Sequence, residues 1–172
     1  MPFRGRRQLT DQEVCYLQMQ SPAEFCRQVS FGKIRFRTES SQLGLKHDDS
    51  IVKTWYHDEN NEQRVRVCYG IIQEICKHQM YPGGPTQIML KCEWLEEIDV
   101  PEEEDRTKLP RVRRNPDSNF NRYSQFTALA QCAGYNIMLA RHNPWSDPAS
   151  EEYNQFDVID RWRLYENHCQ GL

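Results

Sequence analysis

Two apolar runs joined by a turn dominate this 172-residue chain: residues 64–76 read RVRVCYGIIQEIC, and residues 87–95 read QIMLKCEWL. Both runs alternate apolar with polar side chains and are rich in β-branched and aromatic residues, a pattern typical of strands. The segment between them contains YPGGP at residues 81–85. Because paired Gly and Pro residues end a strand and reverse the chain, the sequence predicts an antiparallel hairpin here.

The same pattern extends outward from this hairpin. Further strands are predicted over residues 29–37, 50–56, 135–140 and 155–159. Helix signals are few: TDQE at residues 10–13 is a capping box for a helix over 11–20, and SPAE at residues 21–24 predicts a second one ending at 27 or 28. Residues 126–133 are expected to form one or two helical turns ended by Gly134, and residues 161–169 a short closing helix.

These elements define the expected architecture. We expect a mainly β fold, a small antiparallel β-barrel or curled sheet, with two short N-terminal helices and a short C-terminal helix. The predicted organisation is a basic arm with short helices at 1–28, a recognition domain at 29–161 and a C-terminal helix or tail at 162–172. Residues 96–124 read as a long polar loop, and loops of that length usually carry function or order only in part.

Composition narrows the class of protein. The net charge is −3, from 22 Lys and Arg against 25 Asp and Glu, and no apolar run approaches the roughly 18 residues that cross a bilayer. The N-terminal MPFRGRR lacks the apolar stretch of a secretory signal. The seven cysteines form no CxxC pair, so they are expected to be reduced thiols in an intracellular protein, with no metal site and no cofactor.

Charge is distributed in blocks. Residues 93–105 carry eight acids and no base, whereas basic residues concentrate before and after them. The candidates for contact with nucleic-acid phosphate are Arg4, Arg6, Arg7, Arg111, Arg113 and Arg114. The alternative is that these arginines face the chain's own acids or solvent, since the sequence pI of about 6.0 is far below that of typical nucleic-acid-binding domains.

Five short motifs occur in a fixed order: VCYGIIQEI at 67–75, MLKCEWL at 89–95, FNR at 120–122, FTALAQCAGYN at 126–136 and FDVI at 156–159. This series resembles a domain of unknown function that accompanies transposases in plant CACTA elements and in related fungal and animal elements. The order of features is also similar to that of bromo-adjacent homology (BAH) domains. These resemblances imply a transposon-derived, nuclear β-barrel that docks chromatin proteins. The acidic segment at 96–105 and the basic segment after it fit neither pattern, and the predicted N-terminal helices lie outside both.

Some BAH domains hold methyl-lysine in an aromatic cage, because ring faces attract a partly dehydrated cation. The cage candidates in this chain are Trp94, Tyr69, Tyr123 and Trp55. Trp94 aligns with the Trp of the BAH pattern, but strand alternation places it beside Cys92 and Leu90 on an apolar face, so packing in the core is the alternative. Trp145, in the segment NPWSDP, is either an interface anchor or a cover for the open edge of the barrel.

Catalytic signatures are missing from the sequence. It contains no GxSxG, P-loop, HExxH or dinucleotide-binding motif, and its aspartates lack the alternating strands and helices of a transposase core. We therefore expect a non-catalytic recognition module that binds a protein or chromatin partner such as a histone tail. The alternative hypothesis is a DNA-binding accessory domain of a transposase that contacts double-stranded DNA through the arginines named above. Neither hypothesis fixes the oligomeric state.

Overall fold

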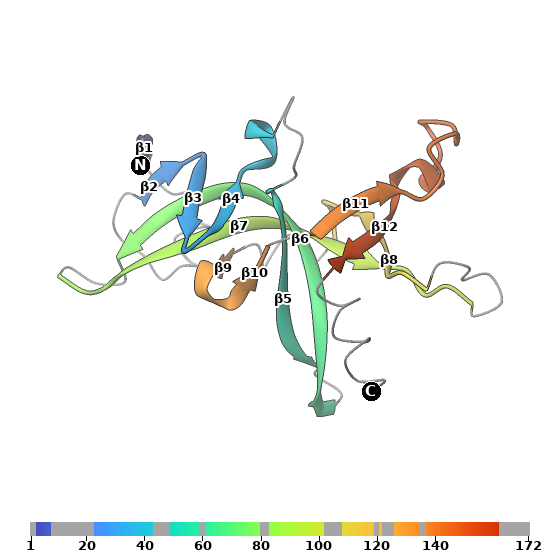
Figure 1. The fold of residues 1–172 in the computed structure, drawn as a ribbon, viewed down its shortest axis with the longest axis horizontal. Coiled ribbons are helices and arrows are strands. Elements are labelled where there is room, and N and C mark those ends of the chain that lie inside the picture. Colours follow the sequence, from blue (N-terminus) through green and yellow to red (C-terminus); the bar gives the residue numbers. More distant parts are fainter. Residues whose placement is uncertain are drawn as a thin grey trace. The chain divides into compact units, whose positions relative to one another are not determined.

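A computed structural model of the chain describes residues 3–7, 23–42, 49–58, 61–79, 83–101, 108–118, 121, 126–134 and 137–161. These residues form antiparallel strands and short 3₁₀ helices (Figure 1). The strands are β1 (Phe3–Arg7), β2 (Ala23–Cys26), β3 (Gln28–Phe31), β4 (Ile34–Arg37), β5 (Ile51–Asp58), β6 (Asn61–Gln79), β7 (Thr86–Glu97), β8 (Arg111–Arg114), β9 (Phe126–Ala128), β10 (Cys132–Ala133), β11 (Ile137–Arg141) and β12 (Gln155–Asp160). The 3₁₀ helices are η1 (Glu39–Ser41), η2 (Leu129–Gln131) and η3 (Glu151–Asn154).

The chain divides into two compact units. Unit 1 consists of Met1–Trp94 and Pro116–Tyr135, and unit 2 of Leu95–Asn115 and Asn136–Leu172. Strand β7 contributes residues to both units, since the division falls between Trp94 and Leu95. None of the described helices is long and apolar enough to cross a membrane.

The 19-residue strand β6 organises unit 1. One of its edges pairs with β5 and, further along, with β2, while the other edge pairs with β7 from Gly70 to Gln79. A bulge between Ile72 and Glu74 interrupts the pairing with β7. Since a bulge bends a strand, it accounts for part of the curvature of β6 in Figure 1. The predicted hairpin of residues 64–76 and 87–95 is thus confirmed, and both strands are longer than expected.

The core of unit 1 lies on one face of this sheet. Ile72 and Ile75 of β6 and Leu90, Cys92 and Trp94 of β7 are each at most 4% exposed. The hairpin β3–β4 adds Val29 and Phe36, and η2 adds Leu129. Leu90, Cys92 and Trp94 follow the alternation of β7, because residues two apart point to the same face. Ile72 and Ile75 are three apart, and the bulge between Ile72 and Glu74 brings both to this face.

Unit 2 contains a smaller antiparallel sheet. The end of β7 pairs with β8, β8 pairs with β12, and β12 pairs with β11. The registers place Leu95, Val112, Val158 and Ile137 on one face, and all four are buried. The opposite face carries Glu96, Arg113, Arg111, Asp157 and Met138, so it is mainly polar.

Two expectations about the architecture need correction. The fold is mainly β and antiparallel as predicted, but the described strands form no closed barrel. The helix predicted to end at residue 27 or 28 is wrong, because Ala23–Cys26 forms strand β2 between β1 and β6. Inter-strand hydrogen bonds outweigh the local capping signal there. The helices predicted over 11–20 and 161–169 lie outside the described residues, except for residue 161. The part of the chain that the structure describes contains no helix of seven or more residues.

Three further segments differ from the prediction. Residues 29–37, predicted as one strand, form the hairpin β3–β4 with Gly32 at positive φ in its turn. Residues 126–133 form β9, the single 3₁₀ turn η2 and β10, and this segment pairs with β7 at one end and with β5 at the other. Within the predicted loop 96–124, residues 111–114 form β8. The alternation in RVRR is too short to stand out in the sequence, and β8 forms because the strands on either side supply its hydrogen bonds.

Trp94 and Gly70 lie directly opposite each other on β7 and β6. The backbone N–H of Trp94 donates to Asn121 Oδ1 at 2.6 Å, and Asn121 Nδ2 donates to the Trp94 carbonyl at 2.8 Å. Both polar groups of Trp94 therefore point away from β6, which makes Gly70 and Trp94 a non-hydrogen-bonded pair, the type with the closer approach. A Cβ at Gly70 would lie 2.6 Å from Trp94 Cε3, so this approach requires glycine.

We predict that Gly70→Ala lowers the free energy of unfolding by about 1–3 kcal/mol, because the added methyl overpacks the indole. In a Trp94→Leu background the same substitution should cost much less, since the ring atoms that it meets are gone. Urea denaturation of the two single variants and the double variant measures this coupling. An equal cost of Gly70→Ala in both backgrounds would contradict the proposed contact.

His78, near the end of β6, is 5% exposed, and its Nδ1 has no hydrogen-bond partner among the described residues. Burial lowers the pKa of His78 from its ordinary value of 6.5. The folded chain therefore binds a proton at this site less readily than the unfolded chain does. The contribution of neutral His78 to stability is complete above pH 6.5 and is lost as the pH falls toward the lowered pKa.

We accordingly expect the free energy of unfolding to decrease more steeply on acidification below pH 6.5 in the wild-type chain than in a His78→Leu variant. Chemical denaturation at a series of pH values gives both curves, and their difference isolates His78 from the other titrating groups. Parallel curves for the two proteins would show that His78 is not the buried neutral group described here.

Candidate functional site

The three predicted cage residues that the structure describes, Trp94, Tyr69 and Trp55, do not converge. Trp94 is 4% exposed and belongs to the core, as the alternative interpretation had it. Tyr69 neighbours Gly70 along β6, so its side chain points to the sheet face opposite Trp94. Trp55 is 50% exposed, and Tyr123 lies outside the described residues. The structure thus separates Trp94 from Tyr69 and Trp55.

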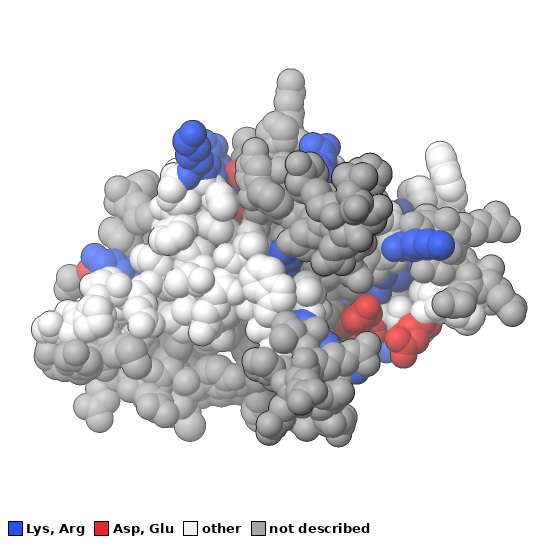
Figure 2. Space-filling view, turned by 60° about the horizontal axis from the view of Figure 1, so that its bottom comes forward, with Lys and Arg blue, Asp and Glu red and all other residues white. Residues whose placement is uncertain are grey.

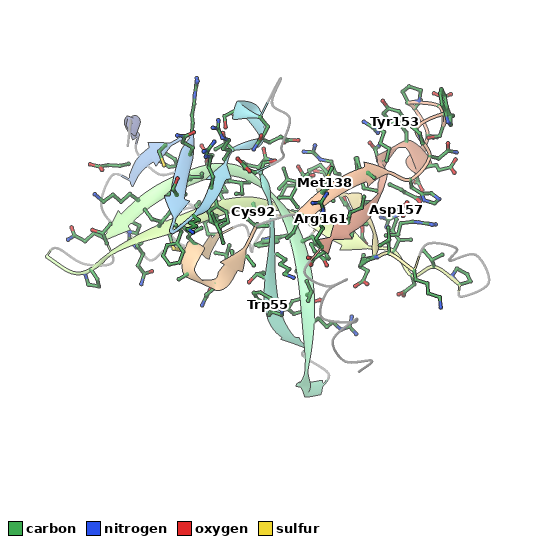
Figure 3. The ribbon with its side chains drawn as sticks, viewed as in Figure 1. Trp55, Cys92, Met138, Tyr153, Asp157 and Arg161 are labelled. Carbon is green, nitrogen blue, oxygen red and sulfur yellow. The ribbon has the colours of Figure 1, made fainter. Side chains whose placement is uncertain are left out.

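Tyr69 and Trp55 do share a face, but a cation of the chain already occupies it. Lys53 is directly opposite Tyr69 in the register of β5 and β6 and is 5% exposed. Its Nζ lies 5.6 Å from the centroid of the Trp55 ring. Figure 3 shows Trp55 on the part of β5 that extends with β6 as a two-stranded arm. A methylated lysine could reach this ring face only by displacing Lys53.

The predicted phosphate-binding arginines of β8 are engaged with acids of the same unit. Arg113 Nε donates to Glu96 Oε2 at 2.8 Å, and Arg111 Nε lies 3.4 Å from Asp157 Oδ1. The other carboxylate oxygen, Asp157 Oδ2, lies 3.0 Å from His142 Nδ1, within hydrogen-bonding distance. Strand alternation places Arg114 on the other face of the sheet. Acidic and basic side chains lie beside each other in Figure 2 as well.

The pKa values report the same pairing. Hydrogen bonds from Arg113 and Asn115 lower the pKa of Glu96, and the bond to Glu96 raises the pKa of Arg113. Both residues are about two-fifths exposed, and ion pairs at that exposure contribute little to stability. Their importance is that the charge of Arg113 is balanced within the chain.

The arginines near the N-terminus lie in strand β1. Its register with β2 places Arg6 opposite Glu24 and Arg7 opposite Ala23, and Arg4 falls at the irregular pairing between Phe3 and Gly5. Within the predicted basic arm, residues 3–7 thus form a strand at the end of the unit 1 sheet.

Of the five described cysteines, Cys26, Cys76 and Cys92 are buried, and Cys68 and Cys132 are partly buried. Burial raises the pKa of Cys92 well above its ordinary value and that of Cys132 to about 11, so both thiols are protonated at neutral pH. Cys76 and His78 point to the sheet face opposite Cys92. No cluster of three or more potential metal ligands occurs among the residues that the structure describes.

The most exposed large apolar side chain of those described is Trp145, which is 93% exposed. It lies in the connection between β11 and β12, residues 142–154, which we call the Trp145 loop. This exposure contradicts the idea that Trp145 covers an edge of the sheet. A Trp buries roughly 150–250 Å² when a partner encloses it, so this side chain offers a large apolar surface to an interface.

Hydrogen bonds within the Trp145 loop fix its backbone. Asn143 Oδ1 accepts from the Trp145 N–H at 3.2 Å, and the Asn143 carbonyl accepts from Ser146 Oγ at 2.7 Å. In the same way, Asp147 Oδ1 accepts from the Ala149 N–H at 2.9 Å, and the Asp147 carbonyl accepts from Ser150 Oγ at 2.7 Å. Ser150 in turn caps η3. The loop is therefore a series of side-chain-stabilised turns and presents Trp145 in a defined position.

The base of the loop is held by Arg141. Its guanidinium carbon lies 3.7 Å from the centroid of the Tyr153 ring, and Nη1 donates to the Tyr153 carbonyl. Asn143 Nδ2 adds a 3.2 Å bond to Glu152 across the loop. Figure 3 shows Tyr153 in this connection and Asp157 in the following strand. Asn-Pro, Asp-Pro and Ser are residues typical of turns, whereas the Arg141–Tyr153 stack carries no local sequence signal.

The chemistry of the loop favours a cationic ligand. Asp147, Glu151 and Glu152 are its charged residues, and it contains no Lys or Arg. A ring face with acids in the same loop attracts a lysine side chain by cation–π and Coulomb interactions.

No family model, curated protein or solved structure matches this chain. The resemblance to the transposon-associated and BAH domains therefore stays a prediction.

We predict that Asn143→Ala loosens the Trp145 loop without unfolding the sheet. Losing one or two hydrogen bonds of about 0.5–1.5 kcal/mol each should speed hydrogen exchange of the Trp145 and Ser146 amides several-fold. Exchange measured by mass spectrometry or NMR, with Asn154→Ala as the control in the same loop, tests this. Unchanged exchange in Asn143→Ala would show that other contacts order the loop.

Proposed function

We propose that the chain is a non-catalytic recognition module that binds a lysine-rich peptide of a protein or chromatin partner, such as a histone tail, through the Trp145 loop. The observation that carries this proposal is the 93% exposure of Trp145 on a backbone held by its own hydrogen bonds. A preorganised aromatic anchor loses little conformational entropy on binding, and Trp is the residue most enriched at the energetic centres of interfaces.

The ligand class follows from charge. An exposed cation–π contact contributes about 0.5–1 kcal/mol, and the three acids of the loop add attraction for a basic segment. Lysine-rich tails combine both features, and the resemblance to BAH domains supports a chromatin partner and a nuclear location. A transposon origin is part of the same proposal and rests on the resemblance.

DNA binding is the alternative function. Arg111 and Arg113 would have to exchange Asp157 and Glu96 for phosphate, which reduces the gain from such a contact. The other arginines that this alternative involves are Arg4, Arg6, Arg7 and Arg114, and the structure describes nothing of the side chains of the first three. DNA binding through several phosphates would weaken by orders of magnitude between about 50 and 200 mM salt, whereas an aromatic anchor would be far less sensitive.

The proposal predicts a specific loss of peptide binding. Fluorescence anisotropy with labelled lysine-rich histone-tail peptides, unmodified and trimethylated, should give a dissociation constant that rises about tenfold or more in Trp145→Ala. Trp55→Ala is the matched control, because Trp55 is also exposed but its ring already contacts Lys53. Equal peptide affinities of Trp145→Ala and wild type would contradict the assignment. Salt-sensitive binding of double-stranded DNA in the absence of peptide binding would favour the alternative.

A further inference from the structure

We propose that the chain associates with a second copy of itself through strand β11, so that two unit 2 sheets join edge to edge in antiparallel fashion. Among the described residues, β11 ends the strand order of unit 2 and is paired with β12 (Figure 1). An edge strand presents a row of backbone donors and acceptors that can pair with another chain. This surface lies outside the Trp145 loop, although Arg141 at its end also holds the base of that loop, and the inference does not depend on the proposed function.

The register shows which backbone groups point outward. The N–H of His142 donates to the Gln155 carbonyl at 3.0 Å, so His142 and Gln155 form a hydrogen-bonded pair. In an antiparallel ladder, hydrogen-bonded pairs alternate with non-hydrogen-bonded pairs. The backbone N–H and C=O groups of Ala140 and Met138, two and four residues before His142, therefore also point toward β12. The N–H and C=O groups of Ile137, Leu139 and Arg141 are therefore the ones that face away from β12.

These outward residues are arranged symmetrically about Leu139. If a two-fold axis passes beside Leu139, that residue pairs with Leu139 of the second copy, and Ile137 pairs with Arg141. Each of these pairs exchanges two hydrogen bonds. On the polar face of the sheet, the 47% exposed side chain of Met138 would lie opposite Ala140 of the second copy. No two like charges oppose each other, so the strand is complementary to itself.

The edge also lacks the usual protection against pairing. Natural edge strands are guarded by Lys, Pro, inward-pointing charges or bulges. The sequence of β11, IMLAR, has neither Lys nor Pro, and its pairing with β12 is regular. Its one charged residue, Arg141, is held over the rings of Tyr153 and Phe156 at 3.7 and 5.4 Å. By contrast, β4 reads IRFR and carries charge at alternate positions.

Pairing of one five-residue strand with its copy makes a small interface, so the dimer should be weak and depend on concentration. Sedimentation velocity on the full chain, between about 1 and 100 μM, tests the pairing. In the paired geometry the two Met138 side chains are diagonal neighbours within reach of each other. Met138→Lys and Met138→Glu should each raise the dimer dissociation constant about tenfold or more by like-charge repulsion, and an equimolar mixture should restore association. Thermal unfolding establishes that both variants remain folded.

Trp145→Ala serves as the control, because it removes the proposed peptide anchor and should dimerise as wild type does. Failure of peptide binding with intact dimerisation would thus overturn the proposed function and leave this inference standing. A wild-type chain that stays monomeric throughout the range would overturn the inference. The same conclusion would follow if both Met138 variants dimerised as well as wild type, or if their mixture did not associate better than either variant.

Discussion

The contact between the Trp94 ring and Gly70 sets the close approach of β6 and β7 in the core of unit 1. Asn121 takes both backbone polar groups of Trp94, so the two strands approach closely at this pair, and glycine leaves the space that the indole fills. The ring then completes an apolar face built by Ile72, Leu90 and Cys92. A second glycine has a similar role: a Cβ at Gly134 would lie 2.5 Å from Phe36 Cε1, which explains a residue that the sequence suggested was a helix cap.

Burial of Trp94 changes which aromatic residue is available for recognition. A side chain committed to the core cannot also form one wall of an open cage, and Lys53 occupies the face shared by Tyr69 and Trp55. The balance of charge in unit 2 has a comparable effect, because Asp157 and Glu96 engage the arginines that the sequence presented as a basic cluster. Among the described aromatic residues Trp145 is the most exposed, and its loop carries three acids.

The sequence predicted the central hairpin and most of the strands, since alternation of apolar residues is a local property. It failed where non-local partners decide the conformation: Ala23–Cys26 became a strand because β6 supplies its hydrogen bonds, and β8 formed because β7 and β12 flank it. For the site, the turn-forming residues around Trp145 were recognisable, but its exposure was not. Neither the Asn121–Trp94 bonds nor the stack of Arg141 on Tyr153 could be inferred from spacing, because tertiary contacts create them.

The central claim is that Trp94 is structural and Trp145 binds the ligand. Labelling the four tryptophans with 5-fluorotryptophan and recording fluorine NMR spectra during titration with a lysine-rich histone-tail peptide tests this claim directly. Single Trp-to-Phe variants assign the resonances. The account predicts that the Trp145 resonance shifts with peptide concentration while the Trp94 resonance stays in place. A peptide-dependent shift of Trp94 with an unmoved Trp145 would contradict it.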